Sequence, residues 1–342
     1  MIKIEDHTTA DLDALALKHY KELTLVPLVD GINYHKVNSL IGRIREQKRV
    51  DAADPIRIAF WDYLLDNAFT NLKRIITGRP VELSLIINEI EAICGNGFFS
   101  NDINYETAKL TDFGTVVKRV FNYLNYRSKP ECRANCQEFN LSYCPNCNEQ
   151  VTQVIEIING LTGATEQRAL LQLDHFYPQV RHPYFSVSFF NLIPGCSVCN
   201  ADLKGEKKFS ITSHFNPFEK RFEDNFSFVL DTFLLSSIDD VNISYINKSA
   251  HDENSLVDFK IIERYKNVAH RKVIFKMVNS FKSHSPRIQS SLMTQFKGLF
   301  TTNSGREILL DNYNIPLKIE EINSVQLGKL KRDIAIQMDI FR

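Results

Sequence analysis

The chain has no net charge and no long apolar run. Its 41 Lys and Arg residues balance 41 Asp and Glu residues. A protein that holds long nucleic acid by itself is usually basic, because Lys and Arg neutralise phosphates. Any such binding here would need a local basic patch or a partner. No apolar stretch approaches the ~20 residues that span a membrane. The acidic, mixed N-terminus also lacks the regions of a signal peptide, so we expect a soluble cytoplasmic protein.

Internal repeats and low-complexity tracts are also missing from the sequence. The 342 residues are enough for two or three domains. Hydrophobic residues make up 44% of the chain, which is enough to fill packed cores and argues against wholesale disorder.

Paired cysteines are the strongest signal in what is present. Four of the seven cysteines form two CxxC pairs, Cys144 with Cys147 and Cys196 with Cys199. An odd count with two such pairs favours metal binding in a reducing compartment over disulfides. Four thiolates match a structural Zn²⁺ with a closed tetrahedral shell. Residues 148–195 separate the pairs, more than the usual gap of roughly 15–20 residues, and we expect a hairpin to occupy this gap.

A second set of polar residues accompanies the cysteines. Asp174 and His175 lie between the two pairs, Asn191 follows, Asn200 comes directly after the second pair, and Lys204 lies four residues later. Asp and Asn supply oxygen ligands of the kind that Mg²⁺ prefers. A histidine, with its ordinary pKa of about 6.5, can act as a general base at neutral pH. This is the chemistry that hydrolyses phosphodiesters with a divalent ion.

The run LDHFYP…FFNLIPGCSVCNADLKG, together with the first cysteine pair, resembles the HNH nucleases. The resemblance covers Cys144 to about Lys208. It is greatest to the HNH proteins of prokaryotic antiphage systems, which act beside Septu-type and retron-linked ATPases. A weaker likeness extends to the HFNPFE run at 214–219, and the first 127 residues carry no family signature.

The resemblance implies a ββα finger around one catalytic metal ion. In such a finger His175 would be the general base that activates water. Asp174 and Asn200 would bind the catalytic Mg²⁺ or Mn²⁺. Asn191 would brace the loop and orient the histidine without binding metal, and Lys204 would hold the scissile phosphate.

These residues also have ordinary structural interpretations. Four buried thiols need no metal ion. Adjacent strand residues point to opposite faces, so an Asp–His dipeptide alone means little. Asn200 could cap a short helix, and the lysines at 207 and 208 would suit a solvated face as well as a nucleic-acid backbone.

Four further residues are weaker candidates. Cys132 and Cys136 form a CxxxC motif, for which ordinary packing or an accessory thiol is favoured over a second metal site. His182 and His214 could help to bind phosphate, although a role in a core or on a surface is favoured for each.

The patterns predict an α+β fold in three regions. A helical bundle over 1–127 and a mixed region over 223–342 would flank the HNH finger, with its structural zinc, over 128–222. Capping residues, helix-starting prolines and apolar spacing indicate five helices in the first region. These expected helices cover about 9–23, 35–48, 56–76, 81–94 and 113–126.

The finger itself is expected to begin with a hairpin. Two β-rich runs, 151–158 and 167–173, are separated by Asn159, Gly160 and Gly163, which would place His175 at the end of the second strand. A short helix over about 199–206 would carry Asn200. In the last region we expect strands at 226–233 and 241–246 and helices at 256–282 and 324–341.

Together these features favour a metal-dependent endonuclease that cuts DNA or RNA beside an ATPase partner. The helices of 1–127 would either dock that partner or simply pack over the finger. The alternatives are a stand-alone restriction-type nuclease and a non-catalytic zinc module that binds nucleic acid or protein. A non-catalytic module would be expected to lack the Asp or the His, and both are present.

Overall fold

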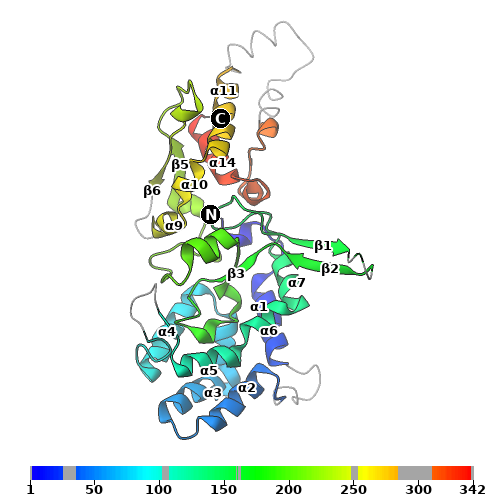
Figure 1. Ribbon diagram of the computed structural model, residues 1–342, viewed down its shortest axis with the longest axis vertical. Coiled ribbons are helices and arrows are strands. Elements are labelled where there is room, and N and C mark those ends of the chain that lie inside the picture. The colour runs from blue at the N-terminus through cyan, green and yellow to red at the C-terminus, as the bar shows by residue number, and fades with distance from the viewer. Residues whose placement is uncertain are drawn as a thin grey trace.

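The computed structural model describes residues 2–25, 36–101, 108–158, 160, 163–247, 253–283 and 310–339. The molecule is elongated, with the N-terminal helices at one end, the C-terminal helices at the other and the cysteine pairs between them (Figure 1). It is a mixed α+β protein whose described strands form two-stranded antiparallel sheets. Within the described ranges, no helix is both long and apolar enough to cross a membrane.

Four of the N-terminal helices begin directly after a capping side chain. The side chains of Asp11, Ser39, Asp54 and Thr111 accept backbone N–H groups at four helix starts, and prolines open α3 and α4. The expected helix over 35–48 begins only at residue 40, and its first residue, 35, lies outside the described ranges. The elements are η1 (Ile4–Asp6), α1 (Leu12–Thr24), α2 (Leu40–Val50), α3 (Pro55–Thr77), α4 (Pro80–Cys94), α5 (Asp112–Phe121) and α6 (Tyr123–Ser128).

Two helices expected to be continuous are interrupted. In α3, residues 66–69 leave helical geometry, and the Asn71 amide donates to the Tyr63 carbonyl oxygen at 3.0 Å. The expected helix over 113–126 stops at Phe121, because Asn122 takes a left-handed φ of 52°. Asparagine tolerates this conformation, and the Asn122 side chain then caps α6.

An aromatic core joins the N-terminal helices to the middle of the chain. Phe60 and Phe99 contact each other at 5.2 Å between ring centroids, and both contact Tyr184, at 6.2 and 5.2 Å. Tyr184 belongs to η3 (Pro183–Phe185), which lies in the segment between β3 and β4. The helices therefore hold that segment in place through buried rings, which are worth roughly 0.5–1.5 kcal/mol per pair beyond their burial.

The middle region differs from the expected hairpin. Val154–Ile158 (β1) pairs with Thr165–Ala169 (β2), and Gln172–His175 (β3) instead pairs with Leu192–Gly195 (β4). The β1–β2 pairing ends, at the side away from the turn, with the Leu170 N–H donating to the Gln153 carbonyl oxygen at 2.8 Å. Residues 170–171 then bend the chain away from β1. His175 is thus paired with Leu192 and not with the first β-rich run. Of the expected turn, Gly163 is described, with a φ of 68°, and Asn159 lies outside the described residues.

Three short helical elements complete this region. Helix α7 (Pro130–Glu138), which the sequence did not predict, precedes the first cysteine pair. η4 (Phe189–Asn191) leads into β4. After β4 comes η5 (Val198–Lys204), a π-helix at the place of the short helix expected over 199–206, closed by the Gly205 N–H donating to the Asn200 carbonyl oxygen at 3.0 Å. The chain order is therefore strand β3, strand β4 and helix η5.

The C-terminal region is more divided than expected. The long helix expected over 256–282 is three helices, because Lys260 has a φ of 50° and the Asn267 side chain caps a new start by accepting the His270 N–H at 2.9 Å. The last expected helix, over 324–341, is shortened to Gly328–Gln337, and residues 340–341 lie outside the described ranges. The elements are α8 (Phe222–Asn225), β5 (Phe226–Leu230), η6 (Ile238–Asp240), β6 (Ile243–Asn247), α9 (Glu253–Asp258), α10 (Ile261–Tyr265), α11 (Val268–Ser283), η7 (Ile319–Ser324) and α14 (Gly328–Gln337).

Candidate functional site

The four paired cysteines converge on one point. Their Sγ atoms all lie within 4.8 Å of one another, and each side chain is buried, Cys196 being the most exposed at 4%. A tetrahedral zinc with Zn–S bonds of about 2.3 Å separates its sulfurs by ~3.8 Å, and the Sγ atoms of Cys147 and Cys196 are 3.9 Å apart. The cluster Cys144, Cys147, Cys196 and Cys199 could therefore hold a zinc ion.

Local backbone geometry turns the thiols toward this point. In the first pair, Asn148 has a φ of 52° and its N–H donates to the Cys144 carbonyl oxygen at 2.7 Å. In the second pair, backbone N–H groups point at sulfur: Cys196 N–H donates to Cys144 Sγ at 3.3 Å, and Cys199 N–H donates to Cys196 Sγ at 3.4 Å. Such bonds stabilise thiolates, which are the form that binds metal.

Charge around the cluster is partly balanced from α10. The Arg264 guanidinium donates to Cys199 Sγ at 3.3 Å and also forms an ion pair with Glu149, two residues after the first pair. Four thiolates around a divalent ion carry net negative charge. A partly buried guanidinium against one sulfur offsets part of that charge.

The C-terminal region covers the first cysteine pair. Asn323 of η7 accepts the Ser142 N–H at 2.7 Å and donates to the Tyr143 carbonyl oxygen at 2.7 Å. The Asn148 side chain accepts the Lys329 N–H at 3.1 Å, and the Tyr265 hydroxyl donates to the Cys147 carbonyl oxygen. With its four sulfurs buried and its loop bonded on both sides, the cluster has the closed form of a structural site.

Asp174 and Lys204 form a buried ion pair beside this cluster. Both side chains are 2% exposed, and the Lys204 ammonium donates to Asp174 Oδ1 at 2.7 Å and to the His175 carbonyl oxygen at 2.6 Å. Burial raises the pKa of Asp174, and the Lys204 charge opposes that rise. Lys204, predicted to hold phosphate, thus bonds Asp174, which was predicted to bind metal. No described residue bonds Asp174 Oδ2.

Asn200 lies on the same side of β3 as Asp174. Its amide nitrogen donates to Gln172 Oε1 at 2.7 Å. Gln172 and Asp174 are two residues apart on the strand and so share a face. Asn200 and Lys204 of η5 therefore reach neighbouring positions of β3. No hydrogen bond joins Asp174 to Asn200 in the described part of the chain.

His175 contacts different neighbours. Its Nε2 lies 3.0 Å from the Ser186 carbonyl oxygen, and its ring packs edge-on against Tyr123 of α6 at 4.6 Å between centroids. Burial lowers the pKa of His175 to about 4; the Ser186 carbonyl opposes this, and Lys204 and Lys118 add to it. Asp174 and His175, although adjacent in sequence, thus face η5 and α6 respectively.

Asn191 is fully buried and braces the segment between β3 and β4. Its Oδ1 accepts the Tyr177 N–H at 2.7 Å, and its amide donates to the carbonyl oxygens of Tyr177 and Phe185, both at 3.2 Å. Phe185 directly precedes Ser186, whose carbonyl contacts His175. The position of the histidine ring therefore depends on Asn191 through the backbone.

The N-terminal helices pack directly on this segment. The Tyr123 hydroxyl donates to the Leu173 carbonyl oxygen at 3.2 Å, and the Tyr177 hydroxyl donates to that of Pro80 at 3.1 Å. His19 of α1 bonds the Val187 carbonyl oxygen at 2.7 Å through Nε2. The N-terminal helices therefore pack on the segment between β3 and β4, and docking of a partner by 1–127 stays a prediction.

The weaker candidates mostly have internal partners. His214 lies between Asp258, 3.0 Å from its Nε2, and Ser213, 2.8 Å from its Nδ1, and Lys207 bonds Asp258 at 2.9 Å. His182 contacts the Tyr184 hydroxyl at 2.9 Å, and burial lowers its pKa to about 3. Their roles in phosphate binding stay predictions.

Several positioning residues have no sequence signal. Asn323 and Arg264 lie far along the chain from the cysteines that they contact, and neither belongs to a motif. Tyr123 lies in a stretch expected to be plain helix. Only Asn148, directly after a cysteine pair, carries a local hint, because Asn is common at left-handed positions.

No protein-family model, curated protein or solved structure matches this chain.

Proposed function

We propose that β3, β4 and η5 form an HNH-type centre that hydrolyses nucleic-acid phosphodiester bonds, with His175 as general base. The observation that carries this proposal is the contact between His175 Nε2 and the Ser186 carbonyl oxygen. A carbonyl oxygen can only accept, so Nε2 bears the proton and the lone pair lies on Nδ1. No described residue bonds Nδ1, and it is not among the fully buried unpartnered atoms.

The environment of His175 suits a base that stays neutral. A pKa of about 4 leaves nearly every molecule with the unprotonated imidazole at pH 7. The same low pKa makes the base weaker than an ordinary histidine, which reduces its intrinsic reactivity. Burial thus lowers the basicity of His175, and the hydrogen bond to Ser186 fixes its tautomer and orientation.

The order of elements supports the same proposal. A strand that ends in His175, a segment braced by Asn191, a second strand and a short helix that carries Asn200 follow one another in the order strand, strand, helix. This order is compatible with a ββα finger, although its strands are not the two runs expected from the sequence. Association with an ATPase partner and a role in antiphage defence rest on that resemblance alone.

Asp174 and Asn200 would hold the Mg²⁺ or Mn²⁺ ion. Their oxygens are the donors that hard cations take, and Asp174 Oδ2 has no described partner, although Oδ1 is held by Lys204. When bound, the ion would stabilise negative charge on the phosphate and on the leaving oxygen. The protein's own residues orient the base: Asn191 fixes the segment, Ser186 fixes the tautomer and Tyr123 fixes the ring.

Cleavage assays with a matched histidine control test the proposal. Purified protein is incubated with plasmid, single-stranded DNA or tRNA in Mg²⁺ or Mn²⁺. His175→Ala should lower the rate by ~10²–10⁴ and leave the zinc content unchanged. The control is His7→Ala, since the buried His7 also bonds a backbone carbonyl, that of Glu320, at 2.8 Å. Equal rates for His175→Ala and the unmodified protein would end the proposal.

A second candidate function is favoured by the Asp174–Lys204 pair. A lysine ammonium bonded to the expected metal-binding carboxylate gives that carboxylate a purely structural partner. The protein would then be a zinc-stabilised module that binds nucleic acid or protein without cutting it. Nucleic-acid binding without cleavage in either metal, and without any effect of His175→Ala, would favour this function.

A further inference from the structure

A cavity lined by arginines lies beside the proposed centre. It measures about 270 Å³ and is lined by residues of α6, α7, β2 and β3 and of the segment that joins the two strands. None of its lining residues is acidic, and three are arginines. The lining consists of Arg127, Cys132, Arg133, Cys136, Gln167, Arg168, Ala169, Leu171 and Leu173.

We call this cavity the arginine pocket. The side chains of its three arginines have few hydrogen-bond or ion-pair partners. The side chains of Arg127 and Arg168 are exposed and form no hydrogen bond or ion pair with a described residue. Arg133 bonds the Ser128 carbonyl oxygen at 3.1 Å through Nη1, whereas its Nε is buried and unpaired.

Several arginines elsewhere in the described chain, unlike those of the pocket, form ion pairs with carboxylates. Arg74 bonds two glutamates, Arg79 bonds Glu5 and Asp13, and Arg264 bonds Glu149. In a chain with equal numbers of acidic and basic residues, a pocket with three arginines and no carboxylate is a local excess of positive charge. Guanidinium groups with free N–H donors match the oxygens of a phosphate group.

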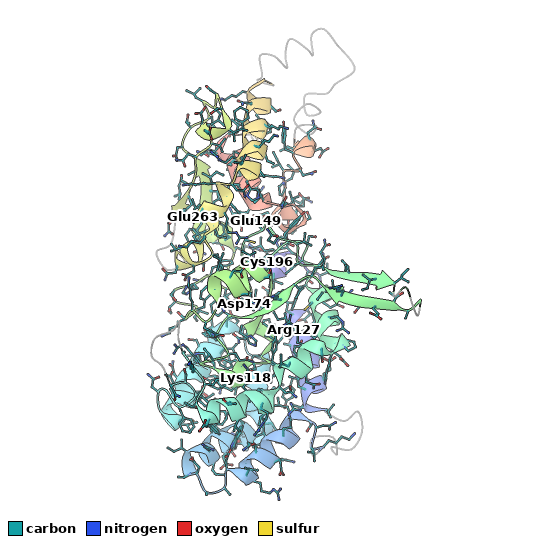
Figure 2. The ribbon with its side chains drawn as sticks, in the orientation of Figure 1. Lys118, Arg127, Glu149, Asp174, Cys196 and Glu263 are labelled. Carbon is teal, nitrogen blue, oxygen red and sulfur yellow. The ribbon has the colours of Figure 1, made fainter. Side chains whose placement is uncertain are left out.

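The pocket adjoins His175 through β3. Leu173 lines the pocket and lies two residues before His175, so the two side chains share one face of the strand. Tyr123 contacts both positions, through its hydroxyl at Leu173 and its ring at His175. Lys118, another exposed cation without a described partner, lies on the side of Asp174 that faces the N-terminal helices (Figure 2).

We propose that the arginine pocket binds a backbone phosphate of the nucleic-acid strand that is presented to His175. This inference rests on the proposed function, because it assigns the pocket to the same substrate. It also accounts for nucleic-acid binding by a chain with no net charge: a local pocket supplies the contacts that a basic surface supplies elsewhere.

Salt-dependent binding tests the pocket separately from catalysis. The probes are labelled single-stranded DNA, duplex DNA and single-stranded RNA, with His175→Ala as the parent so that no strand is cut. Arg127→Ala, Arg168→Ala and their double variant remove exposed side chains and should fold normally. The control is Lys272→Ala, an exposed cation without a described partner on α11, which lies toward the C-terminal end of the molecule and away from the elements of the pocket (Figure 1).

The expected result is a change in the slope of log affinity against log salt. Each lost phosphate contact should reduce the magnitude of this slope by ~0.7 for a single strand or ~0.9 for a duplex. Arg168→Glu should weaken binding more than Arg168→Ala. The probe with the largest change identifies the preferred nucleic acid. Zinc content equal to that of the parent confirms that each variant is folded.

Failure of the pocket and failure of the proposed function give different results. If the unmodified protein cleaves but the double variant keeps the slope of Lys272→Ala, the pocket is overturned and hydrolysis stands. If the unmodified protein cleaves nothing, yet the double variant alone loses slope, the pocket stands and hydrolysis is wrong. If the parent protein binds none of the three probes, the proposed phosphate pocket is overturned.

Discussion

The four-cysteine cluster and the His175 site lie side by side in one segment but are built differently. Each cysteine is buried, and the cluster is bonded by Asn323, Arg264 and Tyr265 from the C-terminal region. His175 is only half-buried, and one of its two nitrogens has no described partner. A closed site whose groups all have partners suits a structural role, whereas an imidazole nitrogen without a partner is open to chemistry.

The two sites also depend on different parts of the chain. The C-terminal elements η7, α10 and α14 hold the cysteine loop, and the N-terminal helices hold the segment around His175 through Tyr123, His19 and the aromatic core. Damage at the cluster should therefore spread toward the C-terminus. Damage around His175 should spread toward the helices.

The largest expected effect is the loss of zinc. Cys147→Ser, or a strong chelator, should unfold residues 140–210 and release the C-terminal elements, because the binding energy of a structural zinc, ~10–16 kcal/mol in finger peptides, is folding energy. Elemental analysis should find one zinc per chain in the unmodified protein and none in the variant. Hydrogen exchange of α10 and α14 reports their release.

Cys94→Ser is the control for this loss. Cys94 is a cysteine outside the cluster, at the end of α4, and its replacement should leave both the zinc content and the protection of α10 unchanged. Protein purified without chelator that contains no zinc would remove the structural role of the cluster.

The next effect separates the two candidate functions. Lys204→Met leaves Asp174 as a buried carboxylate without its cation, which should cost about 3–5 kcal/mol of unfolding free energy. The double variant with Asp174→Asn should cost less than the two single changes together. If Asp174 binds a divalent ion, Mn²⁺ should raise the melting temperature of Lys204→Met more than that of the unmodified protein. Equal Mn²⁺ responses would favour the non-catalytic module.

Asn191 should matter less for stability but more for the shape of the site. Asn191→Ala leaves the Tyr177 N–H and two buried carbonyl groups without partners, which should cost about 3 kcal/mol at ~1 kcal/mol each. Denaturant unfolding measures the loss. Asn200→Ala, which removes one bond from a half-buried side chain, is the control and should cost under ~1 kcal/mol. Equal costs for the two variants would contradict the bracing role of Asn191.

How much of the fold could be predicted from the sequence depends on how far apart along the chain the interacting residues lie. The cysteine cluster and the helix starts at Asp11 and Thr111 follow local patterns, and the structure contains them. The pairing of β3 with β4 was not predicted, because both β-rich runs suit a hairpin and only tertiary packing decides the partner. The breaks at Asn122 and Lys260 depend on single left-handed residues inside strong helical patterns.

For the candidate site, residue identity was easier to predict than residue contact. Asn191 was expected to brace its segment, and its three bonds are of that kind. The bond from Lys204 to Asp174 was not expected, because sequence spacing shows that two residues share a helix face but not which strand residue they meet. The Asn323 contacts join positions about 180 residues apart, beyond the reach of any motif.

The pH dependence of cleavage sharpens the comparison further. A folded-state pKa of about 4 keeps His175 unprotonated above about pH 5, so the rate should be flat between pH 5.5 and about 7.5 as far as this group is concerned. A base with an ordinary pKa of about 6.5 would instead give a tenfold fall per pH unit below pH 6. The unfolded histidine takes up a proton below its ordinary pKa, so His175 also lowers stability as the pH falls from about 6.5 to 4.

The smallest expected effect concerns Lys118. The charge of this exposed lysine lowers the pKa of His175, so Lys118→Ala should raise the pKa of His175 slightly, and nuclear magnetic resonance titration of the labelled imidazole can measure the change. Because the interaction is screened, the rise should shrink as salt brings the Debye length below about 8 Å. Lys272→Ala, on the distant α11, should give no rise at any salt concentration. A pKa for His175 near its ordinary value in the unmodified protein would contradict the burial of the imidazole against Tyr123 and Ser186, and with it the fixed tautomer on which the proposed base depends.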